Sequence, residues 1–157
     1  MMPKEKPSIT ITNTQPEHIP ILAALQRLVF ATLNEAEILT EAKYLKHLQL
    51  FPDGQFVALV HEGDQEIVVG STSTFRTTFD FDDIQHTFLD AAADGWLTNH
   101  DPRGEWLYGI DLMVHPRYRG RRVGRRLYEA RQELVQRLNL RGELAGGMIP
   151  GYHYHRR

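Results

Sequence analysis

The chain has 157 residues, no cysteine and a formal net charge of −2. A chain of this length is the size of one domain and buries enough apolar surface to form a core without disulfides or a structural metal. The lack of cysteine excludes disulfides, thiolate metal sites and cysteine nucleophiles. No apolar run is long enough for a membrane helix, and residues 1–7 lack the apolar centre of a signal peptide. These features predict one cytoplasmic domain over residues 1–157 that does not act at a membrane.

The first half of the chain predicts a strand, two helices and a hairpin. Apolar and polar residues alternate over residues 8–14, which indicates a strand, and apolar residues recur at helical spacing over residues 16–33. A second, shorter helix is expected over residues 41–50, with Thr40 as its N-cap. Two runs rich in Val, Thr and Phe, separated by a short polar turn, predict a hairpin, and they cover residues 55–61 and 66–77.

The second half begins with an acidic segment and ends with a strand, a helix and a strand. Residues 79–104 carry a helical apolar stripe and are rich in aspartate. Residues 105–115 are apolar in long runs, as expected of a central strand that is covered on both faces. The clearest amphipathic helix covers residues 123–138, and a last apolar run covers residues 144–149.

Charge is distributed unevenly along this second half. Residues 79–101 contain six aspartates and no lysine or arginine, whereas residues 117–126 contain six arginines and no acidic residue. This asymmetry fits two surfaces that face partners of opposite charge, and it also fits two ordinary solvated surfaces.

The segment 112–127, LMVHPRYRGRRVGRRL, is the most informative part of the sequence. The predicted strand ends at His115-Pro116, a short turn follows, and a long helix begins. The start of a helix offers unpaired N–H groups and the positive end of its dipole. Gly120 and Gly124 permit a close approach to the backbone, and the arginines add positive charge. These features together predict a binding site for phosphate oxygens.

This segment resembles the cofactor-binding motif of the GNAT superfamily of acetyl-CoA-dependent N-acyltransferases. In that family the strand ends in Val-x-Pro, matched here by Val114-His115-Pro116, and an Arg/Gln-x-x-Gly-x-Gly/Ala loop follows, matched by residues 119–124. The resemblance implies an α/β (α+β) fold with a mixed, mostly antiparallel central sheet flanked by helices. The acidic helical segment would then be an insertion before the central strand.

The resemblance also implies acetyl-CoA as the co-substrate. Backbone amides of the loop would hold the pyrophosphate of coenzyme A, and the backbone of the preceding strand would pair with the pantetheine arm. The residues implied in cofactor binding are Leu112, Met113, Val114, Arg119, Gly120, Arg121, Arg122, Val123, Gly124 and Arg125.

The sequence departs from the family pattern in two places. Arg122 stands where the loop usually has its first glycine, so either the loop tolerates a side chain there or the phosphate contact is altered. GNAT domains also usually continue after the last strand with a helix and two more strands, whereas this chain ends at Arg157. Residues 139–153 resemble GNAT domains fused to a carbon–nitrogen hydrolase. The missing elements would come from a longer polypeptide or a partner, or an open sheet edge would favour a homodimer.

Candidate catalytic residues lie on the predicted central strand and near the C-terminus. Tyr108 and Asp111 are expected on opposite faces of the strand, because side chains alternate. Asp111 is either the general base or a carboxylate satisfied by local hydrogen bonds. The proton donor to the thiolate is often a tyrosine in this family, and Tyr152 is a substitute for it unless it belongs to a frayed tail. Nearby His153 and His155 lack a carboxylate partner, so no metal is assigned.

These observations predict an N-acetyltransferase that moves the acetyl group of acetyl-CoA to a primary amine by direct transfer in a ternary complex. The acceptor would be a small-molecule or peptide amine, and a cationic one if the acidic segment covers the acceptor side. A non-catalytic acyl-CoA-binding or regulatory domain, acting with a partner or fusion, is the alternative. Nucleic-acid binding by the arginines is less favoured, because the rest of the chain is mildly acidic and no nucleic-acid module surrounds them.

Overall fold

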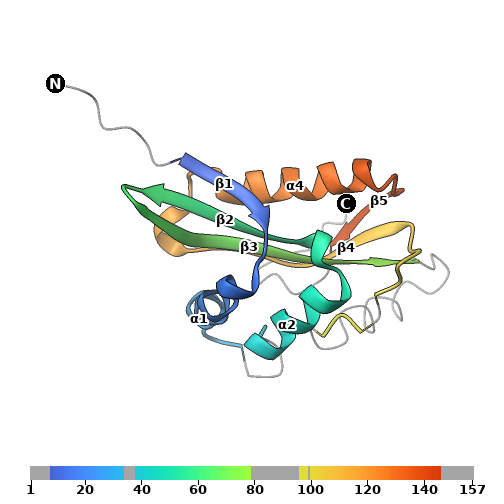
Figure 1. The fold of residues 1–157 in the computed structure, drawn as a ribbon, viewed down its shortest axis with the longest axis horizontal. Coiled ribbons are helices and arrows are strands. Elements are labelled where there is room, and N and C mark those ends of the chain that lie inside the picture. Colours follow the sequence, from blue (N-terminus) through green and yellow to red (C-terminus); the bar gives the residue numbers. More distant parts are fainter. Residues whose placement is uncertain (1–7, 34–37, 79–95, 99, 146–157) are drawn as a thin grey trace.

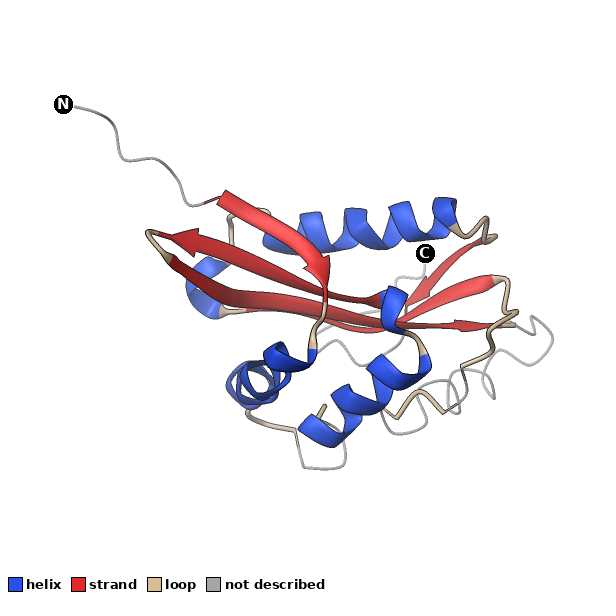
Figure 2. Ribbon diagram, in the orientation of Figure 1, coloured by secondary structure: helices blue, strands red, loops and turns tan. Residues whose placement is uncertain are grey.

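Within the described residues, a five-stranded sheet forms the centre of the fold (Figures 1 and 2). The structure is a computed structural model that describes residues 8–33, 38–78, 96–98 and 100–145. The β1–β2, β2–β3 and β3–β4 pairs are antiparallel, and β5 pairs with β4 in parallel. In spatial order the strands are β1 (Ser8–Asn13), β2 (Gln55–Glu62), β3 (Gln65–Thr77), β4 (Trp106–Val114) and β5 (Gly142–Ala145). The predicted mixed, mostly antiparallel sheet is confirmed.

Helices cover both faces of this sheet. Helices α1 (Ile19–Val29) and α2 (Glu41–Leu50) lie on one face, and α4 (Val123–Arg137) lies on the other (Figure 1). Thr40 caps α2 as predicted, because its hydroxyl accepts a hydrogen bond of 3.3 Å from the Lys43 N–H. Within the described ranges, no helix is long and apolar enough to cross a membrane. The predicted acidic helix falls mostly on residues 79–95, which lie outside the described residues.

The sheet separates two hydrophobic clusters, and β4 contributes to both. Tyr108, Ile110 and Met113 belong to the cluster under α1 and α2. Leu107 belongs to the cluster under α4, and Leu112 packs against that cluster. The long apolar runs of this strand therefore reflect burial on both faces, as the sequence predicts.

A β-bulge interrupts the pairing of β3 with β4. Ser73 pairs with Asp111 and Thr74 pairs with Gly109, so Ile110 is an extra residue on β4. One extra residue reverses the alternation of side chains beyond it. The prediction that Tyr108 and Asp111 lie on opposite faces is therefore wrong. Tyr108 packs in the α1 and α2 cluster, and the Asp111 carboxylate is hydrogen-bonded to α1 on the same face.

Strand β5 accompanies only the first part of β4. The parallel pairing runs from Trp106–Gly142 to Gly109–Ala145. From Ile110 to Val114, the edge of β4 that faces away from β3 is next to no strand in the described part of the chain. The last strand was predicted over residues 144–149, and β5 begins two residues earlier, while residues 146–149 lie outside the described residues.

Candidate functional site

The turn between β4 and α4 places two residues in the left-handed backbone region. A short 3₁₀ helix, Pro116–Tyr118, follows β4, and the His115 side chain accepts a hydrogen bond of 3.1 Å from the Arg117 N–H. Gly120 then has φ of +80°, and Arg122 has φ of 67° and ψ of 16° immediately before α4 begins. The first N–H groups of α4 have no partner within the helix, so they are available to a bound anion.

The backbone conformation of Arg122 bears on the first departure from the family motif, in which this arginine stands in place of a glycine. Its backbone adopts the conformation that glycine adopts freely, which costs a residue with a Cβ about 1–2 kcal/mol. The side chain is exposed, so it meets no steric obstacle in the turn. Of the two alternatives, the structure favours a loop that tolerates the side chain.

The six arginines of the turn and the first turns of α4 are all exposed, and they divide into two groups. Arg117, Arg119 and Arg122 make no side-chain hydrogen bond or ion pair with the described residues, so their charge is available to an anion. The other three have partners: Arg126 donates to the Ile9 carbonyl at 2.9 Å, Arg121 lies 5.1 Å from the Tyr118 ring centre, and Arg125 lies 3.7 Å from the Glu129 carboxylate.

The end of β4 packs directly against the start of α4. A Cβ on Gly124 would lie 3.5 Å from the Leu112 side chain and 3.7 Å from the Val114 side chain. The His115 N–H donates to the Val69 carbonyl at 2.7 Å, so its polar backbone faces β3. Because hydrogen-bonded and non-hydrogen-bonded positions alternate along antiparallel strands, the N–H and C=O groups of Leu112 and Val114 face the opposite, open edge. Met113 is buried under α1 and α2.

Asp111 lies beside the bulge and is 3% exposed. Its carboxylate accepts one hydrogen bond of 2.8 Å from the Gln26 side-chain amide and one of 3.1 Å from the Ser73 N–H. Burial raises the pKa of Asp111 from 3.8 to about 7, although both hydrogen bonds and the charge of Arg131 act to lower it. A carboxyl group with this pKa is able to exchange a proton near neutral pH.

The inward face of α2 consists of polar, titratable residues that the sequence analysis left without a role. Lys43, Tyr44 and His47 are all buried. The Tyr44 hydroxyl and the Ser71 hydroxyl have no partner in hydrogen-bonding geometry among the described residues. Burial and then the negative charge of Asp111 raise the pKa of Tyr44. The spacing of Tyr44 and His47, three residues apart on one helical face, was the available sequence signal.

The other two predicted catalytic residues are Tyr108 and Tyr152, and the structure describes only the first. Tyr108 is 2% exposed, and its ring lies 5.1 Å from the Phe75 ring, so it contributes to the core on the same face as Asp111. Tyr152 lies outside the described residues. In the described ranges, no group of three potential metal-ligating side chains gathers in one place.

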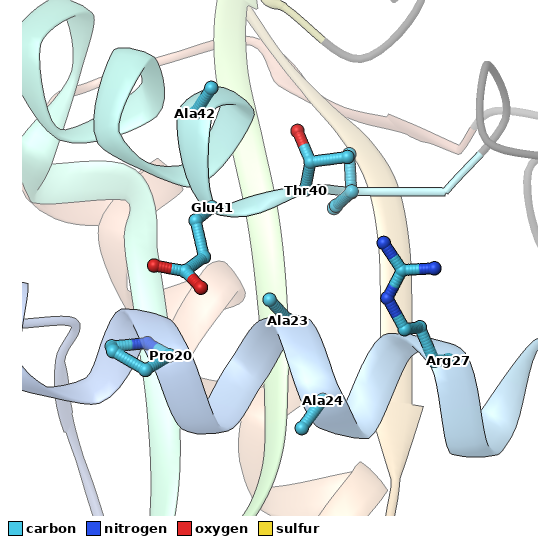
Figure 3. Close-up of a pocket in the computed structure, with 8 residues that line it drawn as sticks. Pro20, Ala23, Ala24, Arg27, Thr40, Glu41 and Ala42 are labelled. Atoms are coloured by element: carbon cyan, nitrogen blue, oxygen red, sulfur yellow. The ribbon is translucent and has the colours of Figure 1, made fainter.

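A groove of about 410 Å³ lies between α1 and the start of α2 (Figure 3). Its charged residues are Arg27 on α1 and Glu41 on α2. The groove also reaches Leu39, whose N–H donates to the Gln26 side-chain oxygen at 3.0 Å. Gln26 therefore connects a wall of the groove to the Asp111 carboxylate. The full lining is Pro20, Ala23, Ala24, Arg27, Leu39, Thr40, Glu41 and Ala42.

Comparisons with known proteins give matches over most of the chain. Residues 22–147 match the acetyltransferase (GNAT) family. The chain is 32% identical over 147 residues to the uncharacterized N-acetyltransferase YkwB of Bacillus subtilis (strain 168), covering 93% of this chain and 63% of that protein. It is 49% identical over 109 residues to the probable hydrolase YhcX of the same organism, covering 69% of this chain and 20% of that protein.

Among solved structures, the GphF GNAT-like decarboxylase in complex with isobutyryl-CoA aligns with a TM-score of 0.60 at 26% identity. The alignment covers 76% of this chain and 55% of that one. The chain therefore spans less than two thirds of the length of each of these three relatives.

Proposed function

Because the chain belongs to the acetyltransferase (GNAT) family, we propose that it is an N-acetyltransferase that moves the acetyl group of acetyl-CoA to a primary amine. The observation that carries the proposal is the turn before α4. There the left-handed Arg122 leads into a helix N-terminus beside two further arginines, Arg117 and Arg119, whose side chains make no hydrogen bond or ion pair with the described residues.

The cofactor would lie along β4 and across this turn. The N–H groups at the start of α4, with the exposed arginines, would bind the pyrophosphate. The open edge at Leu112 and Val114 would pair with the amides of the pantetheine arm, as a further strand does. That arm would point the thioester toward the bulge and Asp111. The isobutyryl-CoA in the complex of the GNAT-like decarboxylase GphF supports an acyl-CoA ligand for this fold.

The reaction would be a direct transfer in a ternary complex, since the chain has no cysteine to carry the acetyl group. The amine nitrogen would attack the thioester carbonyl, so that a C–N bond forms and the C–S bond breaks. Asp111 would take the proton from the nitrogen, and the departing thiolate would receive one. Tyr152 remains the predicted donor for that second proton. Holding the two substrates together can by itself lower the barrier by about 7–11 kcal/mol.

The acceptor would be a small-molecule or peptide amine. The acidic segment would attract a cationic amine if it covers the acceptor side. Replacing Asp80, Asp82 and Asp83 with Asn is expected to raise KM for a cationic amine and to leave KM for a neutral amine unchanged. Equal effects on both amines would exclude this charge-based selection.

A non-catalytic acyl-CoA-binding domain is the second candidate, and two observations favour it. Both carboxylate oxygens of Asp111 already accept hydrogen bonds, which is what a purely structural carboxylate would do. The chain also corresponds to only a fifth of the protein named probable hydrolase YhcX, which supports the predicted fusion to a hydrolase.

Thermal unfolding with and without acetyl-CoA tests the proposed site. At a ligand concentration of a hundred times Kd, binding is expected to add about 2.7 kcal/mol of stability, a rise of several degrees in Tm. This rise should disappear in a double variant, Arg119→Ala with Gly124→Glu, whose Tm without ligand serves as its own reference. Release of free CoA when amines are added then separates the enzyme from the binding domain. An equal rise in both proteins would show that acetyl-CoA binds elsewhere.

A further inference from the structure

Arg131 of α4 is a buried cation that joins three strands of the sheet. Its side chain is 3% exposed, and its guanidinium donates to the Glu143 carboxylate of β5 at 2.7 Å. It also lies 3.5 Å from the Thr72 hydroxyl of β3, which itself donates to the Asp111 carbonyl at 2.6 Å. The Tyr128 ring lies 4.9 Å from the guanidinium carbon. A chain of polar contacts therefore runs from β5 through Arg131 and Thr72 to Asp111.

The same guanidinium lies close against β4 at the bulge. A Cβ on Gly109 would come within 3.0 Å of three guanidinium atoms, so no larger residue fits there while Arg131 keeps its place. Gly109 is the last β4 residue that pairs with β5, and the extra residue Ile110 follows it. Arg131 therefore contacts the backbone at the point where β4 leaves β5 and reverses its side-chain alternation.

Burying the charge of an arginine costs free energy that its polar partners must offset. The partners of Arg131 are Glu143 and Thr72. Its desolvation costs several kcal/mol, and an apolar residue of similar volume often stabilises a core equally well or better. Its Nε has no hydrogen-bond partner among the described residues, so stability alone does not explain the choice. The planar fork reaches Glu143 with Nη2 and Thr72 with Nη1, two separate nitrogens where a lysine has only one.

We propose that Arg131 is a positioning residue, which holds the β4 bulge and Asp111 in the arrangement that acyl transfer requires without touching either substrate. This inference rests on the proposed acyltransferase function. Acting from the α4 face, Arg131 fixes the backbone at Gly109 and the carbonyl of Asp111. The Asp111 carboxylate on the other face is then held in one conformation.

Backbone NMR of variants tests this role without requiring a known acceptor. In Arg131→Met, the amide signals of Gly109, Ile110 and Asp111 are expected to shift, because the contacts that define the bulge are lost. Carboxyl NMR should show a higher pKa for Asp111, since the charge of Arg131 lowers it, while Tyr44, Lys43 and His47 on α2 remain in place. In Arg131→Lys, the positive charge is kept, so the pKa of Asp111 should stay close to that of the unaltered protein. The amide signals of the bulge should still shift, because the planar guanidinium is lost. This variant therefore separates the effect of charge from the effect of geometry.

The matched control is Arg137→Met, which removes the same charge from an exposed position on the same helix and should leave all these signals unchanged. If Arg131→Met does not fold, Thr72→Val still tests the proposal, because it removes only the hydroxyl between Arg131 and the Asp111 carbonyl. Either variant should lower kcat about tenfold or more, with the Kd for CoA changed less than about threefold.

The proposed function and the positioning role fail in different ways. If the unaltered protein binds CoA but transfers no acyl group to any amine, the proposed function is wrong, and the NMR signals still decide whether Arg131 holds the bulge. If the amide signals of Gly109 to Asp111 stay in place in folded Arg131→Met and Thr72→Val, the positioning role is wrong. A transfer rate within about twofold of the unaltered protein would also overturn it.

Discussion

The Asp111 carboxylate and the Gln26 side-chain amide form a 2.8 Å hydrogen bond that ties β4 to α1. Gln26 is 2% exposed, and its oxygen accepts from the Leu39 N–H just before α2. A single side chain therefore links the first helix, the entry to the second helix and the candidate general base. Movement of α1 or of the segment before α2 would alter the surroundings of Asp111 through this link.

Gln26→Met is expected to destabilise the protein by about 1–3 kcal/mol, because it leaves the buried Leu39 N–H without its partner. It should also raise the pKa of Asp111, since the hydrogen bond from Gln26 lowers that pKa. Denaturant unfolding and carboxyl NMR measure the two effects. Gln132→Met, at an exposed position on α4, should change stability by less than about 0.5 kcal/mol. An unchanged Asp111 pKa in Gln26→Met would show that the hydrogen bond does not stabilise the charged carboxylate.

Asp111 should make the stability of the protein depend on pH. Its pKa is about 7 in the folded protein against 3.8 for an ordinary aspartate, so the folded state binds the proton more tightly. The stabilisation by this proton is fully present below about pH 4 and is lost as the pH rises through 7. Across that window, the free energy of unfolding should fall by up to about 1.4 kcal/mol per pH unit.

Asp111→Asn isolates this contribution from those of other titrating groups. The difference in unfolding free energy between the two proteins should move in favour of the variant as the pH rises from about 4 to about 7. A difference that stays constant with pH would mean that Asp111 is charged throughout. The same variant should lose acyl transfer but keep CoA binding if Asp111 is the general base.

Arg122→Gly should relieve the strain of the turn before α4. Glycine adopts a φ of 67° without the cost that a Cβ imposes, but it loses more freedom on folding, so a net gain of up to about 1 kcal/mol is expected. Arg122→Val should instead destabilise, because a branched side chain is poorly tolerated at positive φ. Thermal unfolding compares the three proteins. If Arg122→Val is as stable as the unaltered protein, the turn carries no strain at this position.

The architecture was readable from the sequence because its signals are local. The alternation around Ile9, the helical spacing after Val123 and the cap at Thr40 each depend on neighbours in the chain, and each element formed where it was expected. The family motif at residues 119–124 likewise lies on consecutive residues. Element ends were less accurate, as at the helix predicted to residue 33, which ends at Val29 because its cap, Phe30, leaves helical geometry.

The surroundings of Asp111 were not readable, because they depend on pairing between distant segments. The bulge at Ile110 arises from the register between β3 and β4, which no local pattern on β4 reveals. Tyr44 on α2 and Gln26 on α1 meet Asp111 only in the folded chain. In the sequence, Arg131 looks like the other polar residues of an amphipathic helix. Its contact with Gly109 exists only once α4 packs on the sheet.

Gly109→Ala tests the close packing of Arg131 on β4. The added methyl group would displace a buried guanidinium that Glu143 and Thr72 hold, so the protein should lose about 1–3 kcal/mol of stability. Gly124→Ala is the matched control, since its Cβ meets Leu112 and Val114 at ordinary contact distance and alanine favours a helix. Denaturant unfolding without ligand should therefore show a loss for Gly109→Ala and no loss for Gly124→Ala. Equal stability of the two variants would mean that the guanidinium moves aside easily, and a side chain that yields in this way could not hold the bulge.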